Sequence, residues 1–396
     1  MPQKRFLTGL GPVPPVLGLA VSGGGDSVAL LVLAAEAGIP CRAVTVDHGL
    51  RPEAAEEARQ VAYLCARLQV PHEVLHWQWD GKGNLPDAGR RARRRLIAEW
   101  AAGHGIGTVA FGHTRDDVAE TFLMRLARGA GLDGLSAMAP AWEEHGLHWR
   151  RPLLSVGREE LRDLLRARGF GWADDPTNSD MAYERARARN ALDALPLDLT
   201  RERLAEVAQH LAAARGALDA ATVTAARHHL RQDRGDVLLD PEGLDPEMQR
   251  RLLLRAVAWV GGHAYPPRAA SVARALDALA QGRPAAVQGC GMVAQKDRWR
   301  IFREWAAVRD LSVPVTDLWD GWRLEGPAQP GLRIAALGEG VILCPHWRDS
   351  GLPRRSLLAS PAVWRGDDLV AAPLAGLGSW TARRVRPLIG LNPPRE

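Results

Sequence analysis

Hydrophobic and polar positions alternate between two patterns along the first 150 residues of the chain. Short apolar runs rich in β-branched residues, typical of buried strands, are each followed by a longer segment whose apolar residues recur at helical spacing. The expected strands are residues 16–21, 41–50, 70–79 and 107–113. The expected helices are residues 27–37, 53–68, 86–102 and 116–128, and Asn84 is placed to cap the third. This alternation predicts an α/β domain whose parallel sheet is covered by helices on both faces.

The alternation fades after about residue 152. Helical spacing continues in residues 158–169, 182–193, 201–227, 249–260 and 268–280, and residues 285–304 are strand-like. From about Val313 the chain is rich in Pro, Gly and Trp, with short apolar runs. We therefore expect three domains: an α/β domain, a mainly helical domain that starts with a connector helix, and a small β-rich domain. Their expected bounds are residues 1–195, 196–310 and 311–396.

The first fifteen residues, MPQKRFLTGLGPVPP, are expected to form a mobile lead-in. Their apolar run is too short and their prolines are too many for a secretion signal. Elsewhere no stretch approaches about 18 consecutive apolar residues, so we predict no membrane span and no membrane partner. The four cysteines are scattered without a C-x-x-C pair, which indicates neither a zinc site nor a disulfide framework and favours a cytoplasmic location.

The charge balance is basic, with a formal net charge of +5. A basic chain fits a polyanionic partner such as a nucleic acid. Arginine supplies nearly all of the positive charge, because lysine occurs only at positions 4, 82 and 296. Codon bias in a GC-rich genome produces the same composition, so charge alone does not decide between the two explanations.

The segment after the first expected strand has the composition of a phosphate-binding turn. Its residues are Ser22, Gly23, Gly24, Gly25, Asp26 and Ser27. Glycines allow a tight turn with inward N–H groups, serines add hydroxyl donors, and the next helix adds the positive end of its dipole. A Walker A loop needs a lysine that is missing here, and G-x-G-x-x-G fails on glycine spacing. The pattern fits the pyrophosphatase loop S-G-G-x-D-S at every position, whereas the structural alternative is a turn that only reverses the chain.

A group of polar residues follows the fourth expected strand, in GHTRDDVAET. Asp116 and Glu120 share one face of the expected helix, and Asp117 with Glu120 forms an alternative pair. Such carboxylates can hold a metal ion, or can hold an amine and accept its proton. Asp26 and Asp117 are the candidates for Mg²⁺, and His113 is a candidate phosphate donor or proton carrier. The structural alternative is that the acidic residues only complement the helix dipole.

Several arginines are candidates for phosphate contacts, because guanidinium groups pair well with phosphate oxygens. The densest cluster is RRARRR, residues 90–95, in which Arg90 and Arg94 share one side of the expected helix. The alternative for this cluster is a solvated helix face. Further along the chain, the candidates to line a path for nucleic acid are Arg151, Arg185, Arg187 and Arg189.

Taken in order, these motifs resemble those of the tRNA(Ile)-lysidine synthetase family, which belongs to the N-type ATP pyrophosphatase (PP-loop) superfamily. The motifs are SGGGDS, VDHGLR, GHTRDDVAETFLMRLARGAGLDGLSAM, RPLL, DDPTN and YERARAR. The match is dense over residues 16–190. Beyond that it rests on domain order and on the run LPRRSLLASPAVWRGDDLV. One departure stands out: the family usually has Arg-Asn-x-x-Arg in its last motif, whereas Ala186 follows Arg185 here.

The resemblance implies a Rossmann-like PP-loop catalytic domain followed by two tRNA-binding domains, with ATP and Mg²⁺ required. It implies that ATP adenylates the C2 oxygen of the cytidine at the first anticodon position of a CAU-anticodon isoleucine tRNA. Free L-lysine then displaces AMP, which gives lysidine, AMP and pyrophosphate and changes the identity of the tRNA from Met to Ile. The enzyme would be a ligase that forms a carbon–nitrogen bond.

The resemblance also implies roles for individual residues. The expected catalytic residues are Asp26, His113, Asp116, Asp117 and Glu120. ATP would be bound by Ser22, Gly23, Gly24, Gly25, Asp26 and Ser27, together with Asp47 and His48 of VDHGLR. The tRNA would be bound by Arg90, Arg94, Arg185, Arg187 and Arg189. The oligomeric state stays open, with a homodimer among the possibilities.

Two other functions stay open at this point. A tRNA thiolase of the same superfamily would use the same ATP chemistry, but it needs cysteines that are not placed here in the pattern of that family. A catalytically silent RNA-binding relative would keep the fold without the reaction. The intact loop serines and carboxylates argue against the silent relative.

Overall fold

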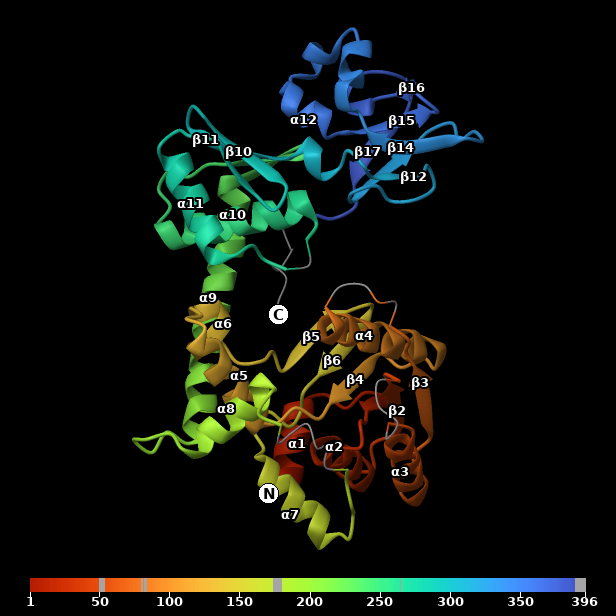
Figure 1. Ribbon diagram of the computed structural model, residues 1–396, viewed down its shortest axis with the longest axis vertical. Coiled ribbons are helices and arrows are strands. Elements are labelled where there is room, and N and C mark those ends of the chain that lie inside the picture. The colour runs from red at the N-terminus through yellow and green to blue at the C-terminus, as the bar shows by residue number, and fades with distance from the viewer. Residues whose placement is uncertain (50–53, 80, 82–83, 174–179, 264, 389–396) are drawn as a thin grey trace. The chain divides into compact units, whose positions relative to one another are not determined.

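The computed structural model shown in Figure 1 describes residues 1–396 except 50–53, 80, 82–83, 174–179, 264 and 389–396. The chain divides into two units, residues 1–215 and 216–396. The boundary falls within the long helix α9 (Arg201–His229), which covers the segment expected to be a connector helix. The finer division at residues 195 and 310 stays a prediction.

The first unit is built on a six-stranded sheet of order β3-β2-β1-β4-β6-β5. The strands are β1 (Leu17–Ala20), β2 (Cys41–Asp47), β3 (His72–His76), β4 (Thr108–Phe111), β5 (Ala141–Glu144) and β6 (Leu147–Arg150). β1 pairs in parallel with both β2 and β4, β2 with β3, and β4 with β6, which confirms the expected parallel sheet. Only β5, at one edge, is antiparallel among these strands.

Helices cover both faces of this sheet, because the side chains of the central strand alternate between them. Leu17 and Leu19 belong to one core together with α1 (Pro2–Leu10), α2 (Gly25–Glu36), α3 (Ala54–Arg67) and α7 (Arg158–Ala167). Ala20 belongs to the other core with α4 (Leu85–Gly103), which Asn84 caps as expected by accepting a 3.3 Å hydrogen bond from the Asp87 N–H. Gly18 is fixed by packing, since a Cβ there would lie 2.9 Å from Val109.

The N-terminal segment is part of the core, so the expectation of a mobile lead-in is wrong. Residues Pro2–Leu10 form α1, and Phe6 and Leu10 on one face of this helix are fully buried. The proline stands in the first turn, where its missing N–H costs no hydrogen bond. The spacing of two large apolar residues at i and i+4 was the signal for an amphipathic helix, and the proline content of the segment obscured it.

A third group of helices packs beside the sheet. It contains α5 (Arg115–Ala127), α6 (Leu132–Leu135), α8 (Glu184–Asp193) and the first part of α9. Buried residues of α5, α8 and α9 form one cluster that includes Val118, Leu192 and Leu204. Gly129, at φ +69°, follows the end of α5, as expected for a glycine that terminates a helix.

The second unit combines helices and antiparallel sheets. Its first sheet has the order β7-β8-β11-β10-β9 and packs against α10 (Pro246–Gly261) and α11 (Ala269–Ala280). The strands are β7 (Leu230–Asp233), β8 (Asp236–Leu239), β9 (Ala285–Val287), β10 (Cys290–Gln295) and β11 (Arg298–Arg303). The middle of the chain is mainly helical, as expected, and the hairpin β7–β8 adds two strands to the strand-like segments that were predicted.

The end of the chain is rich in β structure, as predicted. β12 (Ser312–Pro314), β14 (Leu332–Ala336), β15 (Pro361–Arg365) and β16 (Asp368–Ala371) form one sheet, and β13 (Trp322–Glu325) pairs with β17 (Thr381–Arg384). Trp299 and Trp319 are buried in the cores of the second unit, so core packing accounts for both side chains.

All four cysteines are free thiols. Of the helices in the described part of the chain, none combines the length and the apolar character that a membrane span requires.

We predict that Phe6→Ala lowers the free energy of unfolding by about 3–5 kcal/mol, because it removes a fully buried ring and leaves a cavity. Urea denaturation measures this loss. Leu7→Ala is the matched control on the same helix, since Leu7 is 39% exposed and its truncation should cost far less. Equal losses for the two variants would show that α1 is not anchored in the core.

Candidate active site

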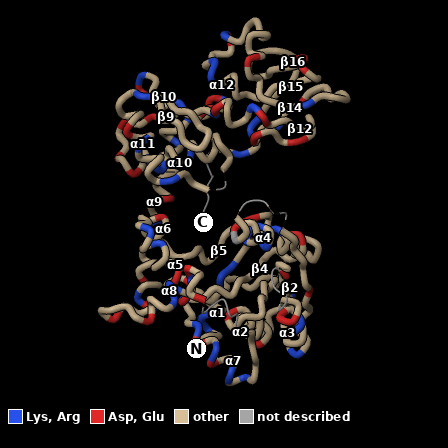
Figure 2. Tube along the Cα trace, in the orientation of Figure 1, with Lys and Arg blue, Asp and Glu red and all other residues tan. Residues whose placement is uncertain are grey.

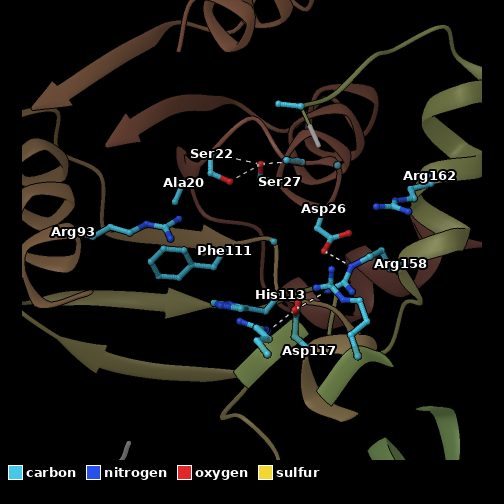
Figure 3. Close-up of a pocket in the computed structure, with 16 residues that line it drawn as sticks. Ala20, Ser22, Asp26, Ser27, Arg93, Phe111, His113, Asp117, Arg158 and Arg162 are labelled. Atoms are coloured by element: carbon cyan, nitrogen blue, oxygen red, sulfur yellow. Dashed lines mark hydrogen bonds and ion pairs between the residues drawn. The ribbon is translucent and has the colours of Figure 1, made fainter. Parts of the chain in front are cut away.

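The candidate active site is a cavity of about 290 Å³ at the carboxyl ends of β1 and β4. Figure 3 shows the side chains that line it. They include Ser22, Asp26 and Ser27 from the loop after β1, Phe111 at the end of β4 and His113 just after it, Asp117 of α5, and arginines from three other helices. Polar residues after parallel strands thus meet at one edge of the sheet, as expected for this type of fold.

The predicted phosphate loop has the backbone needed for a tight turn. Gly23 has a φ of +93°, and Gly24 caps α2, whose N-terminus opens at the loop. Ser27 shapes this turn, because its hydroxyl donates to the Gly24 carbonyl at 2.8 Å and accepts from the Ser22 N–H at 3.1 Å. Gly112, just after β4, lets the chain pass close to the backbone of Asp26, since a Cβ at this position would lie 2.8 Å from the Asp26 carbonyl oxygen.

A second cavity of about 460 Å³ borders the first. It is lined by Asp47 and His48 at the end of β2, and it shares Ser22, Gly24, Arg93 and Ala173 with the first cavity. The Asp47 carboxylate accepts a 2.8 Å hydrogen bond from the Gly49 N–H, and the His48 ring meets Trp77 edge-on at 5.5 Å. Except for Gly23, the two groups of residues assigned to ATP from the sequence therefore line two adjoining cavities.

Arg158, the first residue of α7, binds three carboxylates of the site at once. Its Nε lies 3.0 Å from Asp26, its Nη2 lies 2.9 Å from Asp117, and its Nη1 lies 2.8 Å from Glu120. Figure 3 shows this side chain between Asp26 and Asp117. The backbone N–H of Arg158 also donates to Asp116 at 2.8 Å. One residue that the sequence analysis did not select thus contacts all four predicted catalytic carboxylates.

Two arginines of α8 complete the charge balance. Arg185 donates to Asp117 at 2.6 Å and to Glu120 at 2.7 Å, and Arg189 donates to Glu120 at 2.9 Å. Figure 2 shows the basic segments of α8 beside the acidic segments of α5. Three guanidinium groups therefore face Asp26, Asp117 and Glu120, which is the pairing that buried charges require.

Burial and the nearby arginines shift the pKa values of these carboxylates in different directions. Burial raises the pKa of Asp26 to about 6, although the charge of Arg158 opposes this rise. Burial would also raise the pKa values of Asp117 and Glu120, but Arg158 and Arg185 outweigh it and hold both pKa values below the usual range. Asp26 is therefore the carboxylate of this group whose charge changes closest to neutral pH.

Asp117 has a structural function as well. Its Oδ2 accepts hydrogen bonds from the Thr114 N–H at 2.7 Å and from the Thr114 hydroxyl at 3.1 Å, which closes a capping box at the start of α5. Its Oδ1 faces Arg158 and Arg185. One oxygen of Asp117 thus caps α5, whereas the other takes part in the charged cluster of the site.

The remaining residues predicted for the site are divided among the protein interior, the cavity wall and the surface. Glu120 is 0% exposed and does not line the cavity, whereas His113 lines it and accepts a 3.2 Å hydrogen bond at Nδ1 from Arg151 Nε. Arg90 is exposed on α4, and Arg94 lies 3.4 Å from Glu144.

On α8, Arg187 donates to the Met181 and Ala182 carbonyls, away from Arg185 and Arg189. Ala186, at the position where an asparagine was expected, is buried in this helix, whereas Asn190 is exposed. The DDPTN motif, residues 174–178, lies outside the described residues.

Sequence reasoning missed Arg93 and Arg158. Arg93 lines both cavities, and its guanidinium lies 4.9 Å above the Phe111 ring. Burial lowers its pKa to about 10. Its place within RRARRR is the available signal, whereas the helical spacing of that cluster favours Arg90 and Arg94. For Arg158 the sequence offers only a basic residue at the start of a helix, where the helix dipole disfavours it.

Comparison with known proteins gives consistent matches. Residues 9–195 match the model of the PP-loop domain. The tRNA(Ile)-lysidine synthase of Ruegeria pomeroyi is 52% identical over 381 residues, which cover 93% of this chain and 91% of the relative. That of Zymomonas mobilis is 40% identical over 74% of this chain and 89% of its own, and that of Mesorhizobium japonicum is 38% identical over 89% and 83%.

We predict that Asp26→Asn changes the pH dependence of stability with a defined sign. With a pKa near 6 in the fold and 3.8 as its ordinary value, native Asp26 binds more protons than unfolded Asp26 between these pH values. Wild-type stability therefore falls, relative to Asp26→Asn, as the pH rises from 4 to 7, by on the order of 3 kcal/mol. Urea denaturation of both proteins at each pH measures the difference.

Asp117→Asn is the matched control, because it should give the opposite slope. The folded pKa of Asp117 is depressed, so its ionised form stabilises the fold above its ordinary pKa and this stability is lost as the pH falls. The deficit of Asp117→Asn relative to wild type should therefore shrink at low pH. A stability difference for Asp26→Asn that stays constant from pH 4 to 7 would contradict the environment described for Asp26.

Proposed function

This chain belongs to the tRNA(Ile)-lysidine synthase family, and on that premise we propose that it uses ATP to join L-lysine to a cytidine of a tRNA. The reaction is assigned to the two adjoining cavities. The target is C2 of the cytidine at the first anticodon position of a CAU-anticodon isoleucine tRNA, and the products are lysidine, AMP and pyrophosphate. The observation that carries the proposal is the similarity to the Ruegeria pomeroyi enzyme over 93% of this chain, together with an intact phosphate loop.

ATP is assigned to both cavities. The phosphates lie on the turn from Ser22 to Ser27 and at the N-terminus of α2, whose N–H groups and dipole stabilise negative charge. The nucleoside lies in the second cavity beside Asp47 and His48. Arg93 lines both cavities, and its guanidinium is suited to charge that develops on pyrophosphate when the α–β bond breaks.

Asp26 and Asp117 are the residues that would hold Mg²⁺. Both line the first cavity, and Mg²⁺ is usually held by one or two carboxylates together with substrate phosphates and water. Within the described residues no three His, Cys, Asp or Glu side chains form a metal-binding group, so the remaining ligands would come from ATP and water. When bound, the ion would neutralise charge on the phosphates.

The three carboxylates of α5 are assigned two different roles, contact with substrate and positioning of other residues. Asp117 lines the cavity and is assigned to contact the lysine amine, which must lose its proton before it attacks C2. Asp116 and Glu120 do not line the cavity. We assign them as positioning residues, because Asp116 accepts the backbone N–H of Arg158 and Glu120 binds Arg158, Arg185 and Arg189.

The tRNA contacts are assigned to exposed arginines. Arg90 on α4 and Arg187 on α8 are exposed, which leaves them accessible to tRNA phosphates. Arg185 and Arg189 line the cavity and bind its carboxylates, so their contact with tRNA would be at the target nucleotide. The domains over residues 196–310 and 311–396 are proposed to hold the body of the tRNA. A homodimer and a cytoplasmic location remain predictions.

A thiolase activity finds no support in the site. None of the described residues that line either cavity is a cysteine. Burial also raises the pKa values of Cys41 and Cys65 to about 11 and 12, which disfavours their thiolates.

We predict that turnover yields AMP and pyrophosphate, and only when the CAU-anticodon isoleucine tRNA and lysine are both present. Thin-layer chromatography of α-labelled ATP distinguishes AMP from ADP, and mass spectrometry of the digested tRNA detects lysidine. Methionine tRNA, which shares the anticodon, is the matched control and should stay unmodified. ADP as the product would contradict the adenylation step, and equal modification of methionine tRNA would contradict the specificity.

We predict that Asp26→Ala lowers kcat by far more than tenfold, while the fold and most of the tRNA affinity persist. The reason is that Asp26 lies in the phosphate loop and pairs with Arg158, so its loss disturbs the triphosphate but not the exposed tRNA surface. Glu36→Ala, at the other end of the same helix, should keep wild-type turnover. If Asp26→Ala retained activity within about tenfold, roughly 1.4 kcal/mol of barrier, the role given to the loop would be wrong.

A further inference from the structure

His113, which lines the first cavity, is in contact with Arg151. They follow β4 and β6, which are neighbouring parallel strands, and Arg151 Nε lies 3.2 Å from His113 Nδ1. The guanidinium is held from two other sides. It lies 4.1 Å above the Trp142 ring, and its Nη1 donates to the Ala139 carbonyl at 2.7 Å. The orientation of Arg151 Nε towards the histidine is therefore fixed by the surrounding structure.

This contact determines which nitrogen of His113 carries the proton. Arginine has only donors, so the ring nitrogen that faces Nε must present a lone pair. In the neutral ring the proton then sits on Nε2. Protonation of Nδ1 would turn the hydrogen bond into a contact between two donors and would place two positive charges side by side.

We propose that Arg151 is a positioning residue that holds His113 as the neutral Nε2–H tautomer. In this form His113 offers the cavity a hydrogen-bond donor and does not carry protons during the reaction. The acceptor is an oxygen of the bound nucleotide or of the base under attack, and this part of the inference rests on the proposed function. Of the two roles considered from the sequence, phosphate donor and proton carrier, the structure assigns the first type.

On balance, the other groups around the His113 ring also favour its neutral form. Burial lowers the pKa of His113 to about 3, and positive charges on Arg151, Arg93 of α4 and Arg185 of α8 add to this effect. Asp117 of α5 opposes it. The ring is therefore neutral at physiological pH, and a donor of fixed tautomer needs no reorganisation when charge develops on the substrate oxygen.

The test is nitrogen NMR of the full-length chain labelled with ¹⁵N-histidine, without substrates and at pH 7. His113→Gln identifies the His113 signals among those of the twelve histidines. We expect an unprotonated Nδ1 and a protonated Nε2 in wild type. An Nδ1–H tautomer, or a charged ring, would overturn the proposal. This measurement needs no activity, so it succeeds or fails independently of the proposed function.

Variants of Arg151 then separate positioning from bulk packing. Arg151→Met should give a mixture of tautomers, whereas Arg150→Met, its neighbour at the end of β6, should leave the His113 signals unchanged. Arg151→Lys keeps a donor and should partly restore the tautomer; it also serves as the second variant if Arg151→Met does not fold. An unchanged tautomer in Arg151→Met would show that Arg151 does not fix the ring.

Kinetics test the role of the donor. His113→Gln keeps an N–H donor but cannot exchange protons, so it should retain roughly ten- to a hundredfold more kcat than His113→Ala. Once His113→Ala has removed the ring, Arg151→Met should cost little more, since Arg151 acts through His113. Equal loss in His113→Gln and His113→Ala, together with a normal tautomer, would refute the donor role and favour proton transfer.

Discussion

The pairing of Arg158 with Asp26, Asp117 and Glu120 holds the active site together. Three carboxylates within reach of one guanidinium would repel one another strongly if they were unpaired, and burial would add a large desolvation cost. Arg158 joins the loop after β1, the helix after β4 and the start of α7 through these bonds. Arg185 and Arg189 bring α8 to the same carboxylates from another direction. The cavity is therefore formed by elements that the charges themselves attach to one another.

The different responses of these carboxylates follow from the number of arginines each one contacts. Among the described residues, Glu120 pairs with three guanidinium groups and Asp117 with two, whereas Asp26 pairs with one, that of Arg158. The charges outweigh burial in the first two cases, and burial prevails in the third. His113, close to the same group, is kept neutral chiefly by burial, and the charges of nearby arginines add to this effect. The site thus combines fixed anions, one carboxylate of intermediate acidity and one neutral donor.

Much of the fold followed from local patterns. The strands β1 to β4 and the helices α2 to α5 lie where the apolar spacing placed them, within a few residues. The hairpin β5–β6 is not predicted because its strands, AWEE and LHWR, mix apolar residues with Glu, His and Arg and form no continuous apolar run. Its turn residues His145 and Gly146 have φ of +53° and +75°, the positive values of a type I′ hairpin. The helix α1 is not predicted because the four prolines of the first fifteen residues, one of them in the helix, obscure the spacing of Phe6 and Leu10.

The sequence by itself determined the α/β class, the identity of the phosphate loop and the family, because each depends on spacing within a short stretch or on a series of such stretches. Tertiary structure decided which charges meet. Arg158 and Asp26 stand 132 positions apart, and nothing in their local sequences specifies that they pair. The tautomer of His113 likewise depends on an arginine 38 positions away. Side-chain partners at such separations are set by the packing of strands and helices, which orients groups that local periodicity leaves independent.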